Sequence, residues 1–480
     1  MGPILRKVLL FGSAGFLFVL LAVSLTPITS PLPPYTGQYE VGILDLETEV
    51  EERREVYGEG VVLKESGEKA FEPVSLIGTG YARLIGIYSP PLQSLVTFFL
   101  WAFGSKTVIP GVVDSPVLGA KTPADGLGKV ITGVDRKGEA KEEESVEELE
   151  DHLELRNLKA RPRIGKERET LPMVVFTHGM AGMSQSYSHL LGSIASHGFI
   201  VAAVEHRDGS GPGTVVHFPE GGERYVWHMQ LEDLQSDNPM TELDLKEAQL
   251  NFREAEIIET IRLFERLNRG DGPKIRNLKP ESPESALPGF EGRLNMSAIT
   301  VAGHSYGATG ALQVLKNAPN KDMPVNGAIV LDPGKGSGPL NHDIKVPILV
   351  MQSGEWTEKQ TEFYGQGWHF DVVRKLVEKT KNGWFMTLGG SAHPSCTDAP
   401  LIVPWIMRLA THTTLNGRIA LKEYISASVD FLEYLGNREK RGTLQKEVTS
   451  RSGPLGESDK RVKVKGEHGA DWEVHVVPTD

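Results

Sequence analysis

The sequence predicts an α/β protein whose mostly parallel sheet carries helices on both faces. From Leu171 onward, short apolar segments rich in β-branched residues alternate with helical patterns, which is the order expected of such a sheet. A glycine-flanked serine directly follows one of these segments, and the content of 39% hydrophobic and 24% charged residues is ordinary for a globular protein. The expected strands are Met173–Thr177, Phe199–Val204, Ala298–Ala302, Gly327–Leu331, Pro347–Gln352 and Trp384–Leu388.

A long helix is expected between the second and third of these strands. Apolar residues recur there at steps of three and four, so they share one helix face, which should pack on the sheet. The members of this apolar stripe are Phe252, Ala255, Ile258, Ile261, Phe264 and Leu267.

The N-terminal segment predicts a membrane contact. Arg6 and Lys7 precede the uncharged apolar run Val8–Leu25, and several prolines follow that run. An uncleaved anchor, a cleaved signal peptide and a buried helix all fit this pattern, and we expect the anchor because the run is longer than in a signal peptide. Residues 1–30 would then anchor a single-pass membrane protein whose catalytic part faces a lumen or the outside. With cleavage the protein would be secreted.

The rest of the chain is expected to divide into a catalytic domain at 31–440 and a polar tail at 441–480. A charged insertion at 137–170 interrupts the domain, because Glu139–Leu155 holds nine acidic residues and one lysine, a local charge of −8. This segment accounts for two thirds of the formal net charge of −12. An acidic chain does not suit the phosphate backbone, so no nucleic-acid partner is expected.

A second apolar stretch, Leu92–Phe103, is too short to cross a membrane. Two interpretations stay open for it. The stretch is either a helix of the hydrophobic core or an interfacial helix whose aromatic side chains enter the headgroup region of a lipid surface.

Metal and cofactor sites have little support in the sequence. Cys396 is the single cysteine, which excludes an intrachain disulfide and a multi-cysteine zinc site. The glycine clusters Gly209–Gly213 and Gly334–Gly338 match neither the dinucleotide fingerprint nor a phosphate loop, and no His-Glu-x-x-His pattern is present. We therefore expect chemistry by oxygen and nitrogen side chains, with no cofactor and no metal.

The segment Gly303–Gly307 reads Gly-His-Ser-Tyr-Gly and joins an expected strand to a helical pattern. In a nucleophile elbow the serine has a strained backbone, and glycines flank it because larger side chains would collide with the neighbouring strand and helix. Ser305 is therefore the candidate nucleophile. The alternative is a serine in an ordinary glycine turn.

A serine nucleophile needs a histidine to accept its proton and a carboxylate to orient that histidine. With this type of elbow the chain order is serine, carboxylate, histidine. Asp332 ends the next expected strand and is preferred to Glu355, which follows the strand after that. We expect His393 to be the base, because Gly389-Gly390 leads to it from the last expected strand, whereas His412 lies in a helical pattern. The other downstream histidines are His369, His468 and His475.

Two backbone N–H groups are expected to bind the oxyanion. One belongs to Tyr306, and the other to Met180, which follows His178 and Gly179 in the loop after the first expected strand. Chain order excludes His178 from the triad, so we expect it to be structural. A structural role is also expected for the charged run Glu205–Asp208, as a mutually neutralised cluster that holds a loop.

Four segments carry a family resemblance within Gly37–Leu435, namely Val174–Gly179, Ser196–Asp208, Gly303–Gly307 and Ser391–His393. In these segments the chain resembles the platelet-activating-factor acetylhydrolases of the plasma and intracellular type II kind, which include fungal phospholipases. The resemblance implies an α/β-hydrolase fold. It also implies that Ser305 is the nucleophile, Asp332 the acid and His393 the base, with Met180 and Tyr306 at the oxyanion hole.

The activity implied by this resemblance is calcium-independent release of an acetyl or a short or oxidised acyl group from the sn-2 position of a glycerophospholipid. Phospholipid at a membrane surface is then the expected partner, and no protein partner is implied. A general carboxylesterase or lipase on the same fold is the nearest alternative. The alternative from another class is a non-catalytic binding protein, which an intact Ser305, Asp332 and His393 set disfavours.

Overall fold

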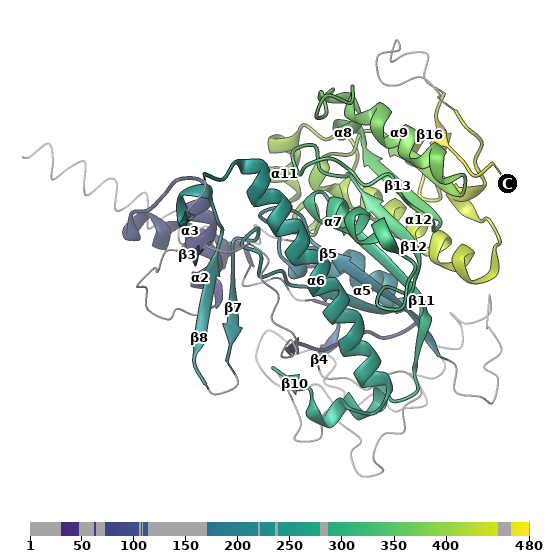
Figure 1. Ribbon diagram of the computed structural model, residues 1–480. Helices are drawn as coiled ribbons and strands as arrows, with labels where there is room; N and C mark the ends of the chain where they lie inside the picture. Colours follow the sequence, from purple (N-terminus) through teal and green to yellow (C-terminus); the bar gives the residue numbers. More distant parts are fainter. Residues whose placement is uncertain are drawn as a thin grey trace, which may run out of the picture.

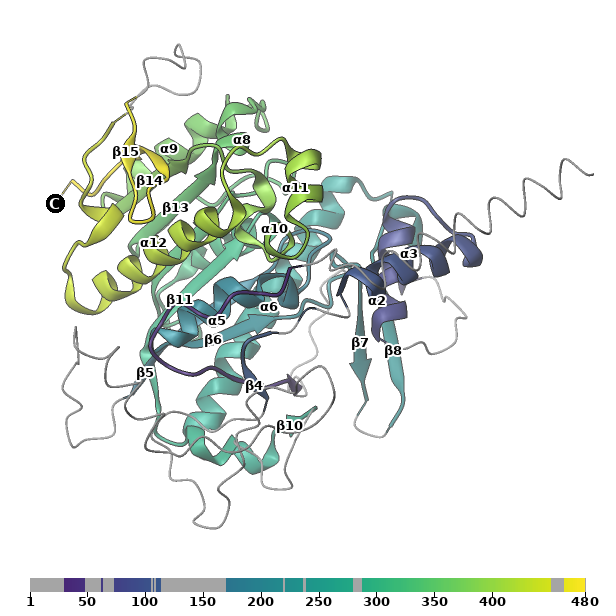
Figure 2. The same ribbon diagram turned by 180° about the vertical axis from the view of Figure 1, so that it is seen from behind.

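The structure, a computed structural model, describes residues 30–47, 62–63, 73–104, 107, 109–113, 170–218, 221–235, 239–278, 287–449 and 462–479. Its main unit is an eight-stranded sheet with the order β15-β16-β14-β13-β12-β11-β5-β6. Figures 1 and 2 show this sheet with helices packed in front of it and behind it. The strands are β5 (Leu171–Thr177), β6 (Ile200–Val204), β11 (Leu294–His304), β12 (Val325–Leu331), β13 (Ile348–Ser353), β14 (Gly383–Leu388), β15 (Val464–Lys465) and β16 (Asp471–Val476).

The α/β class and the mostly parallel sheet are confirmed. The strands from β6 to β14 pair in parallel in the order β6-β5-β11-β12-β13-β14, and β16 and β15 add an antiparallel edge. All six expected strands are present. Their C-terminal ends agree with the predicted ends to within one residue, except that β11 extends two residues further, to His304.

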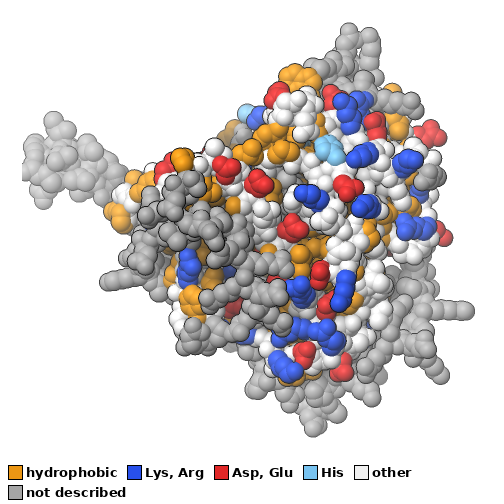
Figure 3. Space-filling model, in the orientation of Figure 1, with side chains coloured by type: hydrophobic (Ala, Val, Ile, Leu, Met, Phe, Trp, Pro, Cys, Tyr) orange, Lys and Arg blue, Asp and Glu red, His pale blue; other side chains and the backbone are white. Residues whose placement is uncertain are grey.

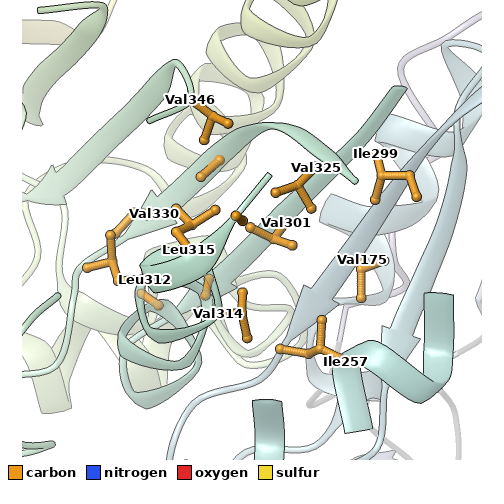
Figure 4. Close-up of a cluster of buried hydrophobic side chains, with 14 of the residues drawn as sticks. Val175, Ile257, Ile299, Val301, Leu312, Val314, Leu315, Val325, Val330 and Val346 are labelled. Carbon is orange, nitrogen blue, oxygen red and sulfur yellow. The ribbon is translucent and has the colours of Figure 1, made fainter. Parts of the chain in front are cut away.

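Helices cover both faces of the sheet because alternate strand residues point to opposite sides. Val175, Val301 and Val330 lie in one core cluster with the helices α6 and α7, part of which Figure 4 shows. Val174 and Ile329 lie in the other cluster, with α5 and α12. The helices around the sheet are α5 (Ser188–Ser196), α6 (Glu242–Asn268), α7 (Tyr306–Val314), α8 (Gly354–Glu358), α9 (His369–Thr380), α10 (Ala399–Ile402), α11 (Pro404–Thr411) and α12 (Gly417–Asn437).

The strand order reverses direction at β5. The chain passes from β5 through α5 to β6 on one side, and it then returns to place β11 on the other side of β5. Ligands of open α/β sheets bind outside the carboxyl ends of the strands at such a switch point. The loop after β5 and the turn after β11 therefore meet where a site is expected.

The long helix α6 is confirmed, and so is the C-terminal half of the predicted stripe, because Ile261, Phe264 and Leu267 are buried. The N-terminal half of the buried face differs from the prediction. Gln249, Arg253, Ile257 and Ile261 are buried at steps of four, whereas Phe252, Ala255 and Ile258 are only half-buried. The N-terminal half of the buried face is polar because it packs on a cluster of buried polar groups behind the loop after β5.

The prediction of a polar tail is wrong for residues 462–479. Strand β16 pairs with β14 and extends the sheet, and its Trp472 and Val474 are fully buried. The apolar side chains alternate with polar ones in this six-residue strand, and the antiparallel pairing with β14 buries them against α12. The edge of the sheet is thus formed by the C-terminal segment.

Several small elements lie outside the main sheet. The helices α2 (Pro73–Leu84) and α3 (Pro90–Gly104) adjoin the hairpin of β7 (Gly213–His217) and β8 (Glu223–Trp227), to the left of the sheet in Figure 1. Two-residue strands also pair, namely β1 (Gly42–Ile43) with β4 (Val112–Val113), β2 (Leu46–Glu47) with β10 (Arg276–Asn277), and β3 (Val62–Leu63) with β9 (Leu234–Gln235).

The apolar stretch Leu92–Phe103 forms most of α3, but it is not a core helix. Every α3 side chain whose burial is described is half-buried or exposed, and Leu92 and Trp101 are 50% and 52% exposed. Of the two interpretations that the sequence left open, the core helix is therefore wrong.

None of the helices in the described ranges is long and apolar enough to cross a membrane. The apolar helix α3 has 15 residues, which gives a length of about 22 Å against about 30 Å for a bilayer core. This finding corrects the prediction of a single-pass membrane protein. The predicted anchor at 1–30 and the predicted insertion at 137–170 lie outside the described residues, apart from residues 30 and 170.

Candidate active site

Ser305 occupies a strained turn between β11 and α7. Its φ and ψ angles are 57° and −119°, in a region that residues other than glycine rarely adopt. A Cβ atom on Gly303 would lie 2.4 Å from the Gly307 carbonyl oxygen, and one on Gly307 would lie 2.0 Å from the Thr177 carbonyl oxygen. The strand and helix pack so closely here that both flanking positions need glycine, as expected for a nucleophile elbow.

The buried carboxylate of Asp332 orients the ring of His393. His393 Nδ1 donates to Asp332 Oδ2 at 2.9 Å. Ser353 supports the same carboxylate, since its N–H donates to Oδ1 at 2.6 Å and its hydroxyl to Oδ2 at 2.7 Å. An ionised carboxylate only accepts, so Nδ1 carries the ring proton and Nε2 keeps the lone pair that a general base needs.

The rival carboxylate, Glu355, holds the backbone of the same loop. Its Oε2 accepts the His393 N–H at 2.8 Å, and its own N–H donates to the Ser391 carbonyl. The structure therefore places Asp332 against the imidazole ring and Glu355 against the main chain. Among the other histidines, His468 pairs with Ser426 and His475 with Thr387.

The loop after β5 brings Met180 to the elbow. A Cβ atom on Gly179 would lie 3.2 Å from Ser305 Cβ, so the loop and the serine are in close contact. The N–H groups of Gly179 and Ala181 donate to Tyr187 Oη and to the Ser210 carbonyl. In the part of the chain that the structure describes, the Met180 N–H has no protein acceptor.

Tyr306 is the first residue of α7. The first N–H groups of a helix have no acceptor within the helix and favour negative charge, so this end of α7 suits an oxyanion. Both predicted donors thus lie on segments that adjoin Ser305.

Sequence reasoning missed Arg253, which holds the loop after β5 from behind. This fully buried guanidinium donates to Asp208 Oδ2 at 2.7 Å, to the His178 carbonyl at 2.6 Å and to Ser210 Oγ at 2.5 Å. Burial would raise the pKa of Asp208, but the charge of Arg253 and the hydrogen bonds of Ser210 bring it below its usual value. The signal in the sequence is a charged residue in register with Ile257 and Ile261 on a core-facing helix.

The run Glu205–Asp208 is structural, but its charges are paired with other elements and not with one another. Asp208 pairs with Arg253, His206 Nδ1 lies 2.6 Å from Glu256 Oε2, and Arg207 lies 2.6 Å from Glu47 Oε1. His178 is also structural, because its Nδ1 donates to the Gly179 carbonyl and its Nε2 accepts the His206 N–H. Burial lowers the pKa of His178 to about 3, so this ring is neutral.

His304, Asp332 and His393 offer ligand atoms within 4.8 Å of one another, the one such group found among the described residues. Both ring nitrogens of His304 and Nδ1 of His393 are already engaged in hydrogen bonds between these loops. The donor set therefore fits a hydrogen-bonded catalytic group. Cys396, three residues after His393, is a buried free thiol whose pKa burial raises well above the usual value.

A cavity of about 410 Å³ opens beside Met180. It extends along the N-terminal half of α6. Its lining is Met180, His228, Met229, Gln230, Glu232, Glu242, Leu245, Lys246 and Gln249.

The family model described as "Platelet-activating factor acetylhydrolase, isoform II" matches residues 120–450, which is more than half of the chain. The chain belongs to this family. It is 25% identical over 282 residues to the platelet-activating factor acetylhydrolase of Cavia porcellus, and 31% identical over 281 residues to that of Canis lupus familiaris. Each alignment covers 56% of this chain and 59% of the relative, so the chain spans less than two thirds of these relatives.

A third relative of this acetylhydrolase family member comes from a fungus. The chain is 33% identical over 148 residues to the "Putative phospholipase A2" of Schizosaccharomyces pombe, which covers 29% of this chain and 33% of the relative. The resemblance seen in the sequence is confirmed, and with it the α/β-hydrolase fold.

Proposed function

We propose that this acetylhydrolase family member is a serine esterase that releases an acetyl or a short or oxidised acyl group from the sn-2 position of glycerophospholipids. The observation that carries the proposal is the hydrogen bond of 2.9 Å between Asp332 and His393 beside the strained turn at Ser305. Substrate class comes from the family, since the relatives are named for platelet-activating factor and for phospholipase A2.

In the proposed reaction Ser305 Oγ attacks the sn-2 carbonyl carbon while His393 Nε2 takes the hydroxyl proton. The Met180 and Tyr306 N–H groups bind the oxyanion, and Asp332 stabilises the imidazolium. Collapse of the tetrahedral intermediate breaks the bond to the glycerol oxygen, which leaves with the proton from His393. Water then cleaves the acyl-enzyme by the same steps, with His393 as base again.

A membrane surface is the second part of the proposal. Exposed apolar side chains occur on two helices, with Leu92 and Trp101 on α3 and Trp405 and Leu409, 60% and 71% exposed, on α11. Figures 1 and 2 place both helices toward the same side of the molecule, and Figure 3 shows hydrophobic side chains at the surface there. Such a patch would let the enzyme take its substrate from a lipid surface.

Labelling with a fluorophosphonate probe tests the triad. We expect the wild-type protein to be labelled, Ser305→Ala to lose labelling, and the exposed-serine variant Ser297→Ala to keep it. Labelling that survives in Ser305→Ala would refute the assignment of the nucleophile. Comparing turnover of a short-acyl phosphatidylcholine with that of a neutral short-chain ester then decides between a phospholipase and a general carboxylesterase, the second candidate.

A further inference from the structure

Tyr187 and His304 form a chain of hydrogen bonds that joins the loops around Ser305. His304 Nε2 lies 3.1 Å from the His393 carbonyl oxygen, and His304 Nδ1 lies 2.8 Å from Tyr187 Oη. Tyr187 Oη in turn lies 3.2 Å from the Gly179 nitrogen. The chain therefore runs from the loop of the predicted base, through the residue before the nucleophile, to the loop of the predicted oxyanion hole.

The chemistry of these groups fixes the direction of every bond. A carbonyl oxygen only accepts, so His304 Nε2 carries the proton and Nδ1 is an acceptor in the neutral ring. The Tyr187 hydroxyl then donates to Nδ1, and its oxygen accepts the Gly179 N–H. Burial lowers the pKa of His304 well below its usual value, which agrees with a single neutral tautomer.

Both residues are fixed by their surroundings. Tyr187 is 2% exposed and packs on Phe176, with ring centroids 4.7 Å apart. The ring of His304 lies 4.5 Å from the ring of His393. Neither side chain donates to the oxyanion or takes the proton of Ser305, yet together they hold the segments that do.

At its other end the hydrogen-bond chain holds the Gly179 N–H, in the loop of the predicted oxyanion hole. A peptide whose N–H is held by Tyr187 cannot rotate freely, and it directly precedes the peptide that carries the Met180 N–H. That second peptide is held in turn at its carbonyl, which accepts the Gly182 N–H at 3.0 Å. Removal of the hydroxyl would leave the His304 Nδ1 and the Gly179 N–H unpaired in a buried place.

We propose that Tyr187 and His304 are positioning residues that keep the oxyanion-hole loop and the histidine loop in register with Ser305. This inference rests on the esterase activity proposed above. In this proposal the histidine of the Gly-His-Ser-Tyr-Gly turn links two loops through the hydrogen bonds of its neutral ring. It takes no part in the proton transfer by His393.

Tyr187→Phe tests the proposal, because it removes one hydroxyl and keeps the buried ring. We expect kcat for a soluble short-chain ester to fall by about tenfold or more with KM within about twofold, since misplaced catalytic groups lower kcat. The matched control is Tyr434→Phe, which removes the hydroxyl of another buried tyrosine, bonded to Asn382 Oδ1 at 3.0 Å just before β14 begins. That control should keep the wild-type kcat.

Two variants of His304 test its two hydrogen bonds separately, the one to Tyr187 and the one to the His393 carbonyl. Asn places its amide near the position of Nδ1, so His304→Asn can still pair with Tyr187, whereas Gln reaches the position of Nε2, so His304→Gln can still donate to the His393 carbonyl. The loss in the double variant Tyr187→Phe/His304→Gln should stay close to the larger single loss, because both variants break the same bond. Should Tyr187→Phe fail to fold, the loss of kcat in His304→Gln carries the test.

Unchanged kcat in Tyr187→Phe, or strictly additive losses in the double variant, would overturn the positioning role. Failure of the wild-type protein to hydrolyse any ester or to bind the fluorophosphonate probe would instead refute the proposed function. The two failures are therefore distinguishable.

Discussion

The indole of Trp356 lies flat on the imidazole of His393, with ring centroids 3.8 Å apart and planes inclined by 10°. Trp356 Nε1 donates to the Pro333 carbonyl at 3.0 Å, next to Asp332 in the chain. The ammonium of Lys335 lies 4.8 Å from the indole and donates to the Trp356 carbonyl at 2.6 Å. The indole is thus anchored to the loop that carries the carboxylate, and it fixes one face of the proposed base.

Replacing Trp356 should therefore lower turnover. We expect Trp356→Ala to reduce kcat by about ten- to a hundredfold, because the His393 ring gains freedom to turn away from Ser305. Trp356→Phe keeps a flat ring but loses the bond to Pro333, so its kcat should lie between those of the wild type and Trp356→Ala. Steady-state kinetics on a soluble ester measure this, and equal kcat for Trp356→Ala and the wild type would contradict it.

The glycines of the elbow make a second prediction. Gly307→Ala should destabilise the fold by about 1–3 kcal/mol or more and abolish most activity, because the new Cβ would collide with the Thr177 and His178 carbonyls and push α7 away from β5. Gly436→Ala in α12 is the control, since a Cβ there meets no atom within 4 Å. It should leave stability unchanged or raise it by up to about 1 kcal/mol. Urea unfolding compares the two, and a Gly307→Ala protein of wild-type stability would refute the close approach.

Arg253 gives a third prediction, on the stability of the fold. Arg253→Met leaves Asp208 buried without its cation, which should cost about 3–5 kcal/mol of unfolding free energy. The control Arg262→Met breaks a partly exposed ion pair with Glu259 and should cost less than about 1 kcal/mol. Adding Asp208→Asn to Arg253→Met should restore part of the loss. Without such a rescue, the buried pair would not explain the instability.

The proposed lipid-facing patch can be separated from the chemistry. Trp101→Ser with Trp405→Ser should lower turnover of phospholipid in vesicles and reduce sedimentation with them, because apolar area is lost from the surface. Turnover of a soluble short-chain ester should stay at the wild-type rate. Val462→Ser, at a side chain 60% exposed in the C-terminal segment, is the control. A patch variant that sediments like the wild type would contradict the membrane part of the proposal.

The parallel sheet and the elbow could be predicted because their signals are local. A run of β-branched residues marks each buried strand, and two glycines around Ser305 mark a turn that nothing bulkier fits. Chain order then left few partners, and the structure places Asp332 and His393 in contact although 61 residues separate them.

The rest depends on contacts that no local pattern contains. Arg253 and Asp208 lie 45 residues apart, and only the packing of α6 under the loop after β5 shows that each is buried against the other. In the sequence nothing distinguishes Tyr187 from an ordinary core residue. Only the structure shows that its hydroxyl lies between Gly179 and His304. The strand β16 was missed because six residues of alternating pattern are a weak signal inside a polar segment.

A pH-dependent contribution to stability is expected from Asp398. This carboxylate is buried at the start of α5, where its Oδ1 accepts the His189 N–H at 3.0 Å. Burial raises its pKa from 3.8 to about 7, although the hydrogen bonds at the helix start act in the opposite direction. Between these pH values the folded protein holds a proton that the unfolded chain has released. Because the folded state binds more protons, this group makes the unfolding free energy fall as pH rises through that window.

Asp398→Asn should remove that slope while keeping an acceptor for the His189 N–H. We expect the variant to gain stability over the wild type at about pH 8 and to match it or fall below it at about pH 5, as measured by urea unfolding. Asp343→Asn, at an aspartate whose side chain is 58% exposed, should keep the wild-type pH dependence. If Asp398→Asn and the wild type differ equally at both pH values, Asp398 is not the titrating group, because a shifted pKa acts on stability only where its protonation differs between the folded and unfolded states.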